Sequence, residues 1–209
     1  MLTDISLKDF SKQLADKVPV PGGGGASALA GSLAAALGSM AANYSIGKKS
    51  CAIYEDDIRE LLESAGSLRE RLLELIEEDA AAFEPLSKAY AIPKDDPGRE
   101  EALQSATLNA AYAPLDIMDA CADIIEMLDE LKDKCSRLMI SDVACGAILA
   151  GAALRAASFN VFINTVELND RKKAEELELT AERLLDDYLP FADMIAETIM
   201  SDIRAGRED

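Results

Sequence analysis

The chain has 209 residues, which fits one domain, and 49% of them are hydrophobic, enough for a sizeable core. A formal net charge of −18 argues against binding to nucleic acid or to anionic membrane surfaces, because both favour Lys and Arg. Histidine is absent, which excludes His bases, Ser–His or Cys–His pairs and His metal sites. Acid–base chemistry must therefore come from Asp, Glu, Lys, Tyr or Cys.

The four cysteines, Cys51, Cys121, Cys135 and Cys145, show neither CxxC spacing nor the clustering of a zinc site. With no signal-peptide pattern, we expect them to be reduced, mostly buried and cytoplasmic. Two apolar runs, residues 26–42 and 143–162, are expected to be buried helices. The first consists mainly of Ala, Gly and Ser, and the second contains Arg155, whereas membrane spans favour about 20 strongly apolar residues.

The first element is predicted to be an amphipathic helix over residues 6–17 that begins with a capping box formed by Ser6 and Asp9. Its buried face should consist of four apolar residues at helical spacing, Leu7, Phe10, Leu14 and Val18. The Pro–Gly stretch that follows ends this helix.

A run of four glycines, Gly22, Gly23, Gly24 and Gly25, precedes a helix predicted over residues 26–44. Glycine allows a ligand or another backbone to come close, and free N–H groups at a helix N-terminus suit an anion. The alternative is a tight turn into a closely packed helix.

The helix over residues 26–44 is small-residue-rich, apolar nearly all round and expected to be buried. Gly47 ends it, and two cations, Lys48 and Lys49, follow. These lysines either neutralise the C-terminal dipole of the helix or form a positive patch for an anionic substrate.

A long helix is predicted over residues 55–90, and one position of its apolar stripe holds Asp79. A carboxylate at a core-facing position is costly unless it is paired or functional. Burial should raise the pKa of Asp79, which makes it a candidate proton donor or shuttle. The alternative is a buried structural aspartate paired with a lysine or a backbone N–H. Pro85 is expected to kink the helix beside it.

A loop over residues 91–98 leads to an interrupted helix over 99–132, which Pro114 breaks or bends. Three carboxylates on this helix, Asp116, Asp119 and Asp123, indicate a solvated face, with binding of a divalent ion as the alternative.

Ser141 is the expected N-cap of a second small-residue-rich, buried helix, over residues 143–167. Asn160 and Asn164 lie four residues apart on it, and they either bind the edge of a heterocycle or pair with a neighbouring helix. A final helix covers residues 171–204, with Leu177, Leu184, Leu185, Leu189 and Ile195 facing inward. The sequence therefore predicts a single all-α, bundle-like domain over residues 1–209, with six or seven helices and no metal site.

Several of these stretches together resemble one family, the cyclodeaminase/cyclohydrolase family of folate enzymes. The resemblance covers essentially the whole chain, and it departs at Cys135–Ser136, where members often carry Gly-Asn. The matching stretches are Pro21-Gly22-Gly23-Gly24, Ala42-Asn43-Tyr44, Lys48-Lys49, Asp79-Ala80-Ala81-Ala82-Phe83, Ile92-Pro93-Lys94, Ala113-Pro114-Leu115, Ser141-Asp142 and Asn160-Val161-Phe162-Ile163-Asn164.

This resemblance implies an all-α homodimer that binds a tetrahydrofolate derivative near the subunit interface and needs no cofactor beyond that substrate. One family activity opens 5,10-methenyltetrahydrofolate with water, and the other closes 5-formiminotetrahydrofolate with release of ammonia. The chain carries no formiminotransferase segment, which favours the first activity. The alternative is a non-catalytic folate-binding or helical assembly protein.

The resemblance assigns a role to one residue, because the proposed catalytic acid of the family falls on Asp79. The other roles are hypotheses about this mechanism. Asp142 is a candidate partner for the methenyl cation, and Lys48 or Lys49, or the amides of residues 22–25, are candidates to hold the glutamate tail of folate. Asn160 and Asn164 are candidates to bind the edge of the pterin.

Overall fold

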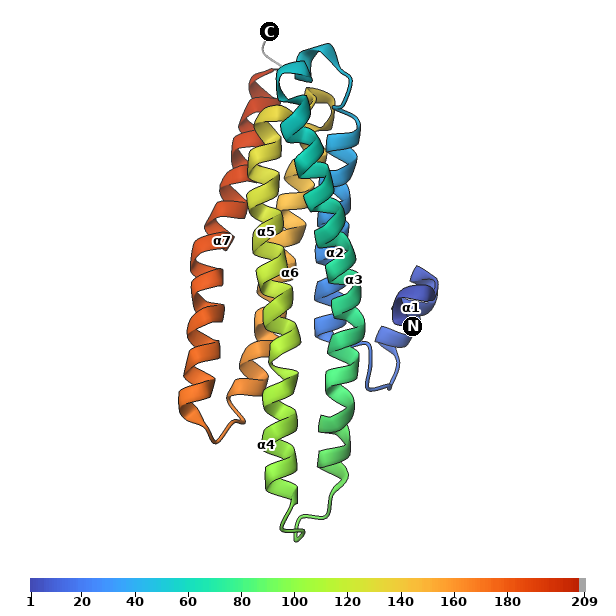
Figure 1. Ribbon diagram of the computed structural model, residues 1–209, viewed down its shortest axis with the longest axis vertical. Helices are drawn as coiled ribbons and strands as arrows, with labels where there is room; N and C mark the ends of the chain where they lie inside the picture. The colour runs from blue at the N-terminus through green and yellow to red at the C-terminus, as the bar shows by residue number, and fades with distance from the viewer. Residues whose placement is uncertain (207–209) are drawn as a thin grey trace.

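The structure is a computed structural model that describes residues 1–206, and it is built from helices alone over that range (Figure 1). The number of α-helices falls within the predicted six or seven. Their bounds are α1 Leu7–Ala15, α2 Gly23–Asn43, α3 Glu55–Ala91, α4 Arg99–Ala110, α5 Tyr112–Lys134, α6 Ile140–Thr165 and α7 Arg171–Ala205. Short 3₁₀ helices cover Leu2–Asp4 (η1), Lys49–Tyr54 (η2) and Arg137–Met139 (η3).

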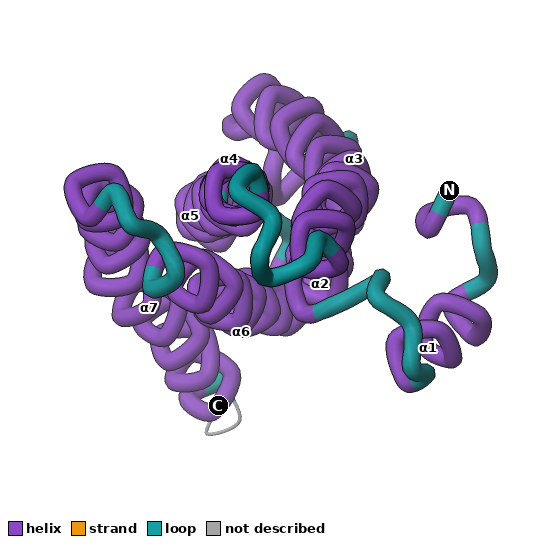
Figure 2. Tube along the Cα trace, turned by 90° about the horizontal axis from the view of Figure 1, so that it is seen from below, coloured by secondary structure: helices purple, strands orange, loops and turns teal. Residues whose placement is uncertain are grey.

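Four long helices, α2, α3, α5 and α6, pack side by side as a bundle, and α7 packs along α6 and α5. Viewed from below, α3, α4 and α5 lie on one side, and α2 and α6 lie on the other (Figure 2). Helix α4 extends the line of α5 and packs against the C-terminal half of α3. The pattern of apolar residues at helical spacing explains this arrangement, because each helix buries one stripe against its neighbours.

Small residues let α2 and α6 approach their neighbours closely. A Cβ atom at Gly38 would lie 2.8 Å from Met127 Cε, and one at Gly146 would lie 3.3 Å from the carbonyl oxygen of Ala34. Both glycines therefore sit where almost any side chain would force a shift. The prediction of two small-residue-rich helices in the core is confirmed for the inner faces of α2 and α6.

Helix α1 has the predicted cap but not the predicted buried face. The Ser6 hydroxyl accepts a hydrogen bond from the backbone N–H of Asp9 at 3.1 Å. Phe10 is buried, whereas Leu7 is 72% exposed and Leu14 and Val18 are also exposed. The expectation that all four face the core is wrong, because α1 lies clear of the bundle beside α2 (Figure 2).

Two predicted helix starts are also wrong. Helix α2 begins at Gly23, with Gly22 as its cap, so the glycine run forms the first turn of the helix rather than a loop before it. Helix α6 begins at Ile140 with Met139 as its cap, so Ser141 is not the N-cap. Local cap signals are weak at both sites because packing fixes where each helix begins.

Other predicted features are confirmed. The break before Pro114 falls at Ala111, between α4 and α5. Asp116, Asp119 and Asp123 form an exposed face of α5. Cys51, Cys121 and Cys135 are buried, Cys145 is exposed, and all four are free thiols.

By length and composition, two helical segments are able to span a membrane, α2 and residues 137–165. About half of each apolar window is buried inside the bundle, 56% in α2 and 50% in the second segment. The remaining apolar residues of both helices lie on the outside of the bundle.

Candidate active site

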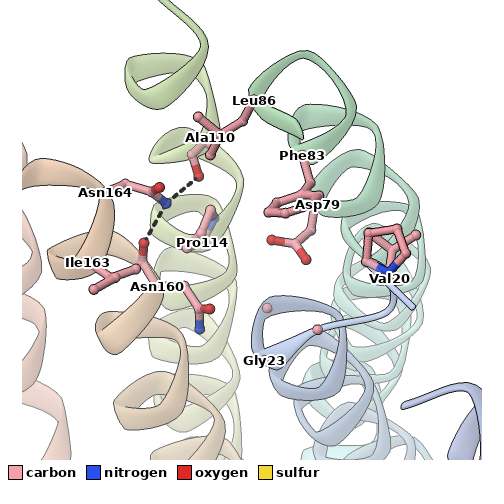
Figure 3. A pocket seen from close by; sticks show the side chains of 13 residues that line it. Val20, Gly23, Asp79, Phe83, Leu86, Ala110, Pro114, Asn160, Ile163 and Asn164 are labelled. Atoms are coloured by element: carbon pink, nitrogen blue, oxygen red, sulfur yellow. Dashed lines mark hydrogen bonds between the residues drawn. The ribbon is translucent and has the colours of Figure 1, made fainter. Parts of the chain in front are cut away.

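A cavity of about 250 Å³ lies where the N-terminus of α2, the middle of α3, the α4–α5 junction and the C-terminal half of α6 meet (Figure 3). Its walls are mostly apolar, with one carboxyl group and two amides. The residues that line it are Pro19, Val20, Gly22, Gly23, Gly24, Asp79, Phe83, Leu86, Ala110, Pro114, Asn160, Ile163 and Asn164.

Among the described residues that line the cavity, Asp79 alone carries a formal charge. It lies on α3 among apolar positions of the helix, and its carboxyl group points into the space between α2 and α6 (Figure 3). Burial raises the pKa of Asp79, and a hydrogen bond from the backbone N–H of Gly25 partly opposes that rise. Of the two partners that the structural alternative offered, the backbone N–H is present, from Gly25, and no ion pair of Asp79 with a lysine is found among the described residues.

The start of α2 fits closely around this carboxyl group. The N–H of Gly25 donates to Asp79 Oδ2 at 3.0 Å, and Oδ1 has no hydrogen-bond donor within residues 1–206. A Cβ atom on Gly24 would lie 2.2 Å from Asp79 Oδ1. The glycine at position 24 is therefore required for the carboxyl group to rest against the helix N-terminus.

Asn164 is held by the break between α4 and α5. Pro114 has no N–H, so the carbonyl oxygen of Ala110 lacks the donor that an unbroken helix would supply four residues later. The Asn164 Nδ2 atom donates to that oxygen at 3.1 Å and to the backbone oxygen of Asn160 at 2.7 Å (Figure 3). Both of its N–H groups are used within the protein, which supports the alternative that this amide pairs with a neighbouring helix.

The Asn160 side chain lies across the pocket mouth from α2. Its Nδ2 atom donates to the carbonyl oxygen of Ala156 at 3.1 Å, and its Oδ1 atom lies 3.2 Å from where a Cβ on Gly23 would be. Its side-chain oxygen has no hydrogen-bond donor among the described residues and remains available as an acceptor.

Three charged residues that were expected to bind substrate, Lys48, Lys49 and Asp142, lie at the other end of the bundle from the pocket. Helix α2 separates Lys48 and Lys49 from the pocket by about 30 Å, since it has 21 residues at ~1.5 Å each. Asp142 lies in the first turn of α6, whereas Asn160 lies near its end. These three residues do not line the Asp79 pocket of the same chain.

The Cys135–Ser136 pair lies at this distant end as well. The Lys48 ammonium group donates to Ser136 Oγ at 2.8 Å, and the N–H of Ser136 donates to Ser45 Oγ at 2.7 Å. These bonds fix the turn between α5 and α6.

The structure brings six of the predicted site residues together around one cavity, and Gly25 bonds to the carboxyl group there; the six are Gly22, Gly23, Gly24, Asp79, Asn160 and Asn164. Sequence reasoning missed the walls formed by Val20, Leu86 and Ile163. No local signal distinguishes these apolar residues from ordinary core residues. The sequence does show that the carbonyl oxygen of Ala110 lacks its usual helical donor, because Pro114 has no N–H group.

An all-helical bundle with a half-buried carboxyl group facing an otherwise uncharged cavity defines a protein able to bind a small molecule and exchange a proton with it. Residues 6–183 match the family described as formiminotransferase-cyclodeaminase, and the chain belongs to this family.

Two relatives illustrate the range of the family. The methenyltetrahydrofolate cyclohydrolase of Methylorubrum extorquens is 35% identical over 202 residues, covering 95% of this chain and 97% of that protein. The formimidoyltransferase-cyclodeaminase of Mus musculus is 28% identical over 173 residues, covering 81% of this chain. The match spans 32% of that longer protein.

The crystal structure of formiminotetrahydrofolate cyclodeaminase from Thermotoga maritima is also similar, with a TM-score of 0.83 and 30% sequence identity. The alignment covers 96% of this chain and 100% of that one. Both the family and the all-α fold predicted from the sequence are thereby confirmed.

Proposed function

We propose that this chain is a folate one-carbon enzyme that opens 5,10-methenyltetrahydrofolate with water to give 10-formyltetrahydrofolate. The observation that carries the proposal is the single negative group in an otherwise uncharged pocket. The methenyl substrate carries a positive charge at its reacting carbon, so a lone carboxylate complements it. The near full-length match to a methenyltetrahydrofolate cyclohydrolase supports this direction of the chemistry.

In the proposed mechanism Asp79 acts as a proton shuttle. A water oxygen bonds to the cationic carbon, and the Asp79 carboxylate accepts one proton from that water. As the bond between this carbon and the N5 nitrogen breaks, Asp79 returns the proton to N5. The hydroxyl oxygen becomes the formyl oxygen and loses its remaining proton to solvent. A pKa raised toward the working pH suits both steps.

A second candidate is ring closure of 5-formiminotetrahydrofolate with release of ammonia, as in the protein from Thermotoga maritima. The same carboxyl group would then protonate the departing nitrogen. The alignment covers the whole length of that protein, which supports ring closure as the second candidate activity.

The test follows the absorbance of 5,10-methenyltetrahydrofolate against its spontaneous decay. The wild type should accelerate the loss, and Asp79→Asn should reduce kcat by about 10² to 10⁴-fold. Asp119→Asn, at an exposed carboxyl on α5, is the matched control and should retain activity.

Three other outcomes have distinct meanings. Near-normal turnover in Asp79→Asn would refute the assignment of this residue. Binding without accelerated loss would favour a non-catalytic folate-binding protein. Ammonia released from 5-formiminotetrahydrofolate would identify the cyclodeaminase.

A homodimer belongs to the same proposal. The outer faces of α2 and α6 expose several large apolar side chains, which is an unusual surface for a monomer with a charge of −18. The large side chains on this face are Leu33, Met40, Tyr44, Ile148, Phe159, Ile163 and Val166. In such a dimer the same patch of each copy would meet across a two-fold axis.

A two-fold axis perpendicular to α2 and α6 would exchange the two ends of the face. The partner's Lys48 and the partner's Lys49 would then approach the Asp79 pocket, although these lysines are about 30 Å away within one chain. The partner's Asp142 would approach the C-terminal half of α6 in the same way. These lysines would hold the anionic glutamate tail of folate, which the 250 Å³ cavity is too small to enclose along with the ring. Measurement of molar mass in solution tests the dimer, and a monomer at all concentrations would rule it out.

A further inference from the structure

The C-terminal end of α3 and the whole of α4 form a helical hairpin, residues 86–110, that extends beyond the start of α2 (Figure 1). The buried apolar residues of the hairpin form a small cluster that is separate from the main core of the bundle. Four residues make up this cluster, Leu86, Ala89, Ala106 and Ala110. A segment that buries so little apolar surface against the rest of the protein can move without unfolding the bundle.

The hairpin also supplies part of the wall of the Asp79 cavity. Leu86 and Ala110 belong both to the hairpin cluster and to the lining of the cavity. The cavity measures about 250 Å³, whereas sites that hold a small molecule usually span about 300–1,000 Å³. A movement of the hairpin would enlarge the cavity, because it would carry Leu86 away from the other walls.

A proline interrupts the helical hydrogen bonding of each leg of the hairpin at its base. Pro85 lies inside α3 and offers no N–H to the carbonyl oxygen of Ala81. Pro114 deprives the carbonyl oxygen of Ala110 of its helical donor in the same way, and the helix breaks at Ala111. Helices bend most easily at such positions, so both legs have a point of bending next to the cavity.

Three hydrogen bonds join the hairpin to the turn between α6 and α7. Gln104 Nε2 donates to the carbonyl oxygen of Glu167 at 2.9 Å, and the N–H of Asn169 donates to Gln104 Oε1 at 2.7 Å. Asn169 Nδ2 donates to Glu100 Oε1 at 2.6 Å. All three bonds are exposed to solvent, so water can replace them at a small cost in free energy.

We propose that the α3–α4 hairpin is a lid over the Asp79 cavity, which bends at Pro85 and at Ala111 and is held closed by the hydrogen bonds of Gln104. Asn164 Nδ2, which donates to the carbonyl oxygen of Ala110 at 3.1 Å, holds the base of α4 in place. The far end of the hairpin therefore moves most, and its opening admits the ligand. Only the identity of that ligand, a tetrahydrofolate derivative, rests on the proposed function.

The movement can be measured as a distance between two spin labels on the whole protein. One label is attached at Asp95→Cys in the loop of the hairpin, and the other at Glu182→Cys on α7, since both positions are exposed. Cys145→Ser removes the one exposed native thiol. The distribution of label distances by pulsed electron resonance then gives the closed and open populations of the lid.

Gln104→Ala should increase the open population about tenfold, because it removes two of the three bonds that hold the lid. Ser105→Ala, at the exposed neighbouring position of α4, is the matched control and should give the wild-type distribution. Adding Pro85→Ala to Gln104→Ala should reduce the open population again, because alanine supplies the N–H that the carbonyl oxygen of Ala81 lacks.

The outcomes separate the lid from the identity of its ligand. An unchanged distribution in Gln104→Ala would overturn the proposal, and an open population that Pro85→Ala does not reduce would overturn the bending point in α3. Saturating tetrahydrofolate should return the Gln104→Ala protein to the closed distance. If the open population responds to both substitutions but not to tetrahydrofolate, the lid is supported and the proposed function is contradicted.

Discussion

Asp79 Oδ2 accepts a hydrogen bond from the backbone N–H of Gly25 at 3.0 Å, which joins groups 54 positions apart in the sequence. The bond anchors one carboxyl oxygen to the first turn of α2 and leaves the other toward the cavity. The anchor fixes where the free oxygen points. A carboxyl group held in this way is well positioned to exchange a proton with a ligand in the cavity.

The raised pKa of Asp79 predicts a pH dependence of stability. Between its ordinary pKa of 3.8 and its raised pKa in the folded protein, the folded state binds more protons at this site than the unfolded state. The contribution of this carboxyl group to the free energy of unfolding is therefore greatest below 3.8 and falls as the pH rises through the folded pKa.

Asp79→Asn removes this dependence, because Asn stays neutral and still accepts from Gly25. We expect the variant to be more stable than the wild type at neutral pH, with the difference disappearing in acid. Urea unfolding of both proteins at several pH values measures it. A variant less stable than the wild type at neutral pH would contradict the burial argument.

Gly24→Ala should displace the carboxyl group, because the new Cβ would lie 2.2 Å from Asp79 Oδ1. We expect kcat to fall about 100-fold, since a shift of about 1 Å in a catalytic group has that effect. The free energy of unfolding should fall by about 1–3 kcal/mol through overpacking.

Gly66→Ala on α3 is the control for this substitution. A Cβ atom there meets nothing within 4 Å, so the variant should be active and about 0.4–1 kcal/mol more stable. Equal activity of the two alanine variants would show that the fit of Asp79 against α2 is not needed.

Asn164→Ala should cost about 1–3 kcal/mol of unfolding free energy, because it leaves the carbonyl oxygen of Ala110 without its donor. Pro114→Ala supplies a backbone N–H that can bond to the same oxygen. The loss caused by Asn164→Ala should therefore be smaller in the Pro114→Ala background. Urea unfolding of the wild type, both single variants and the double variant measures this coupling, and strictly additive effects would refute it.

The dimer predicts the reactivity of one thiol. Cys145 is exposed on the outward stripe of α6, whereas the other three cysteines are buried, and burial raises the pKa of the Cys121 thiol to about 12. We expect one thiol to react with a disulfide reagent, slowly in the dimer and faster after dilution. Cys145→Ser should abolish this phase. A rate independent of protein concentration would mean that this face is not covered.

The sequence alone predicted the helices and identified Asp79 as a carboxylate at an apolar position of its helix. Hydrophobic periodicity located α3 and α7 to within a residue, because a helix that buries one stripe repeats its apolar residues every three to four positions. A carboxylate at a buried position of that stripe stands out for the same reason. The glycine run predicted that a ligand or another part of the chain comes close to this backbone. The structure shows that the group that comes close is the Asp79 carboxyl group.

Only the tertiary structure decided which polar residues share a pocket. Gly24, Asp79 and Asn160 meet because α3 and α6 both run antiparallel to α2, and no local pattern encodes that register. The same packing separates Lys48 and Asp142 from the pocket, although they belong to the same family motifs. The exposed apolar face of α2 and α6 was likewise not predictable, because periodicity shows that a stripe is apolar but not whether its own chain covers it.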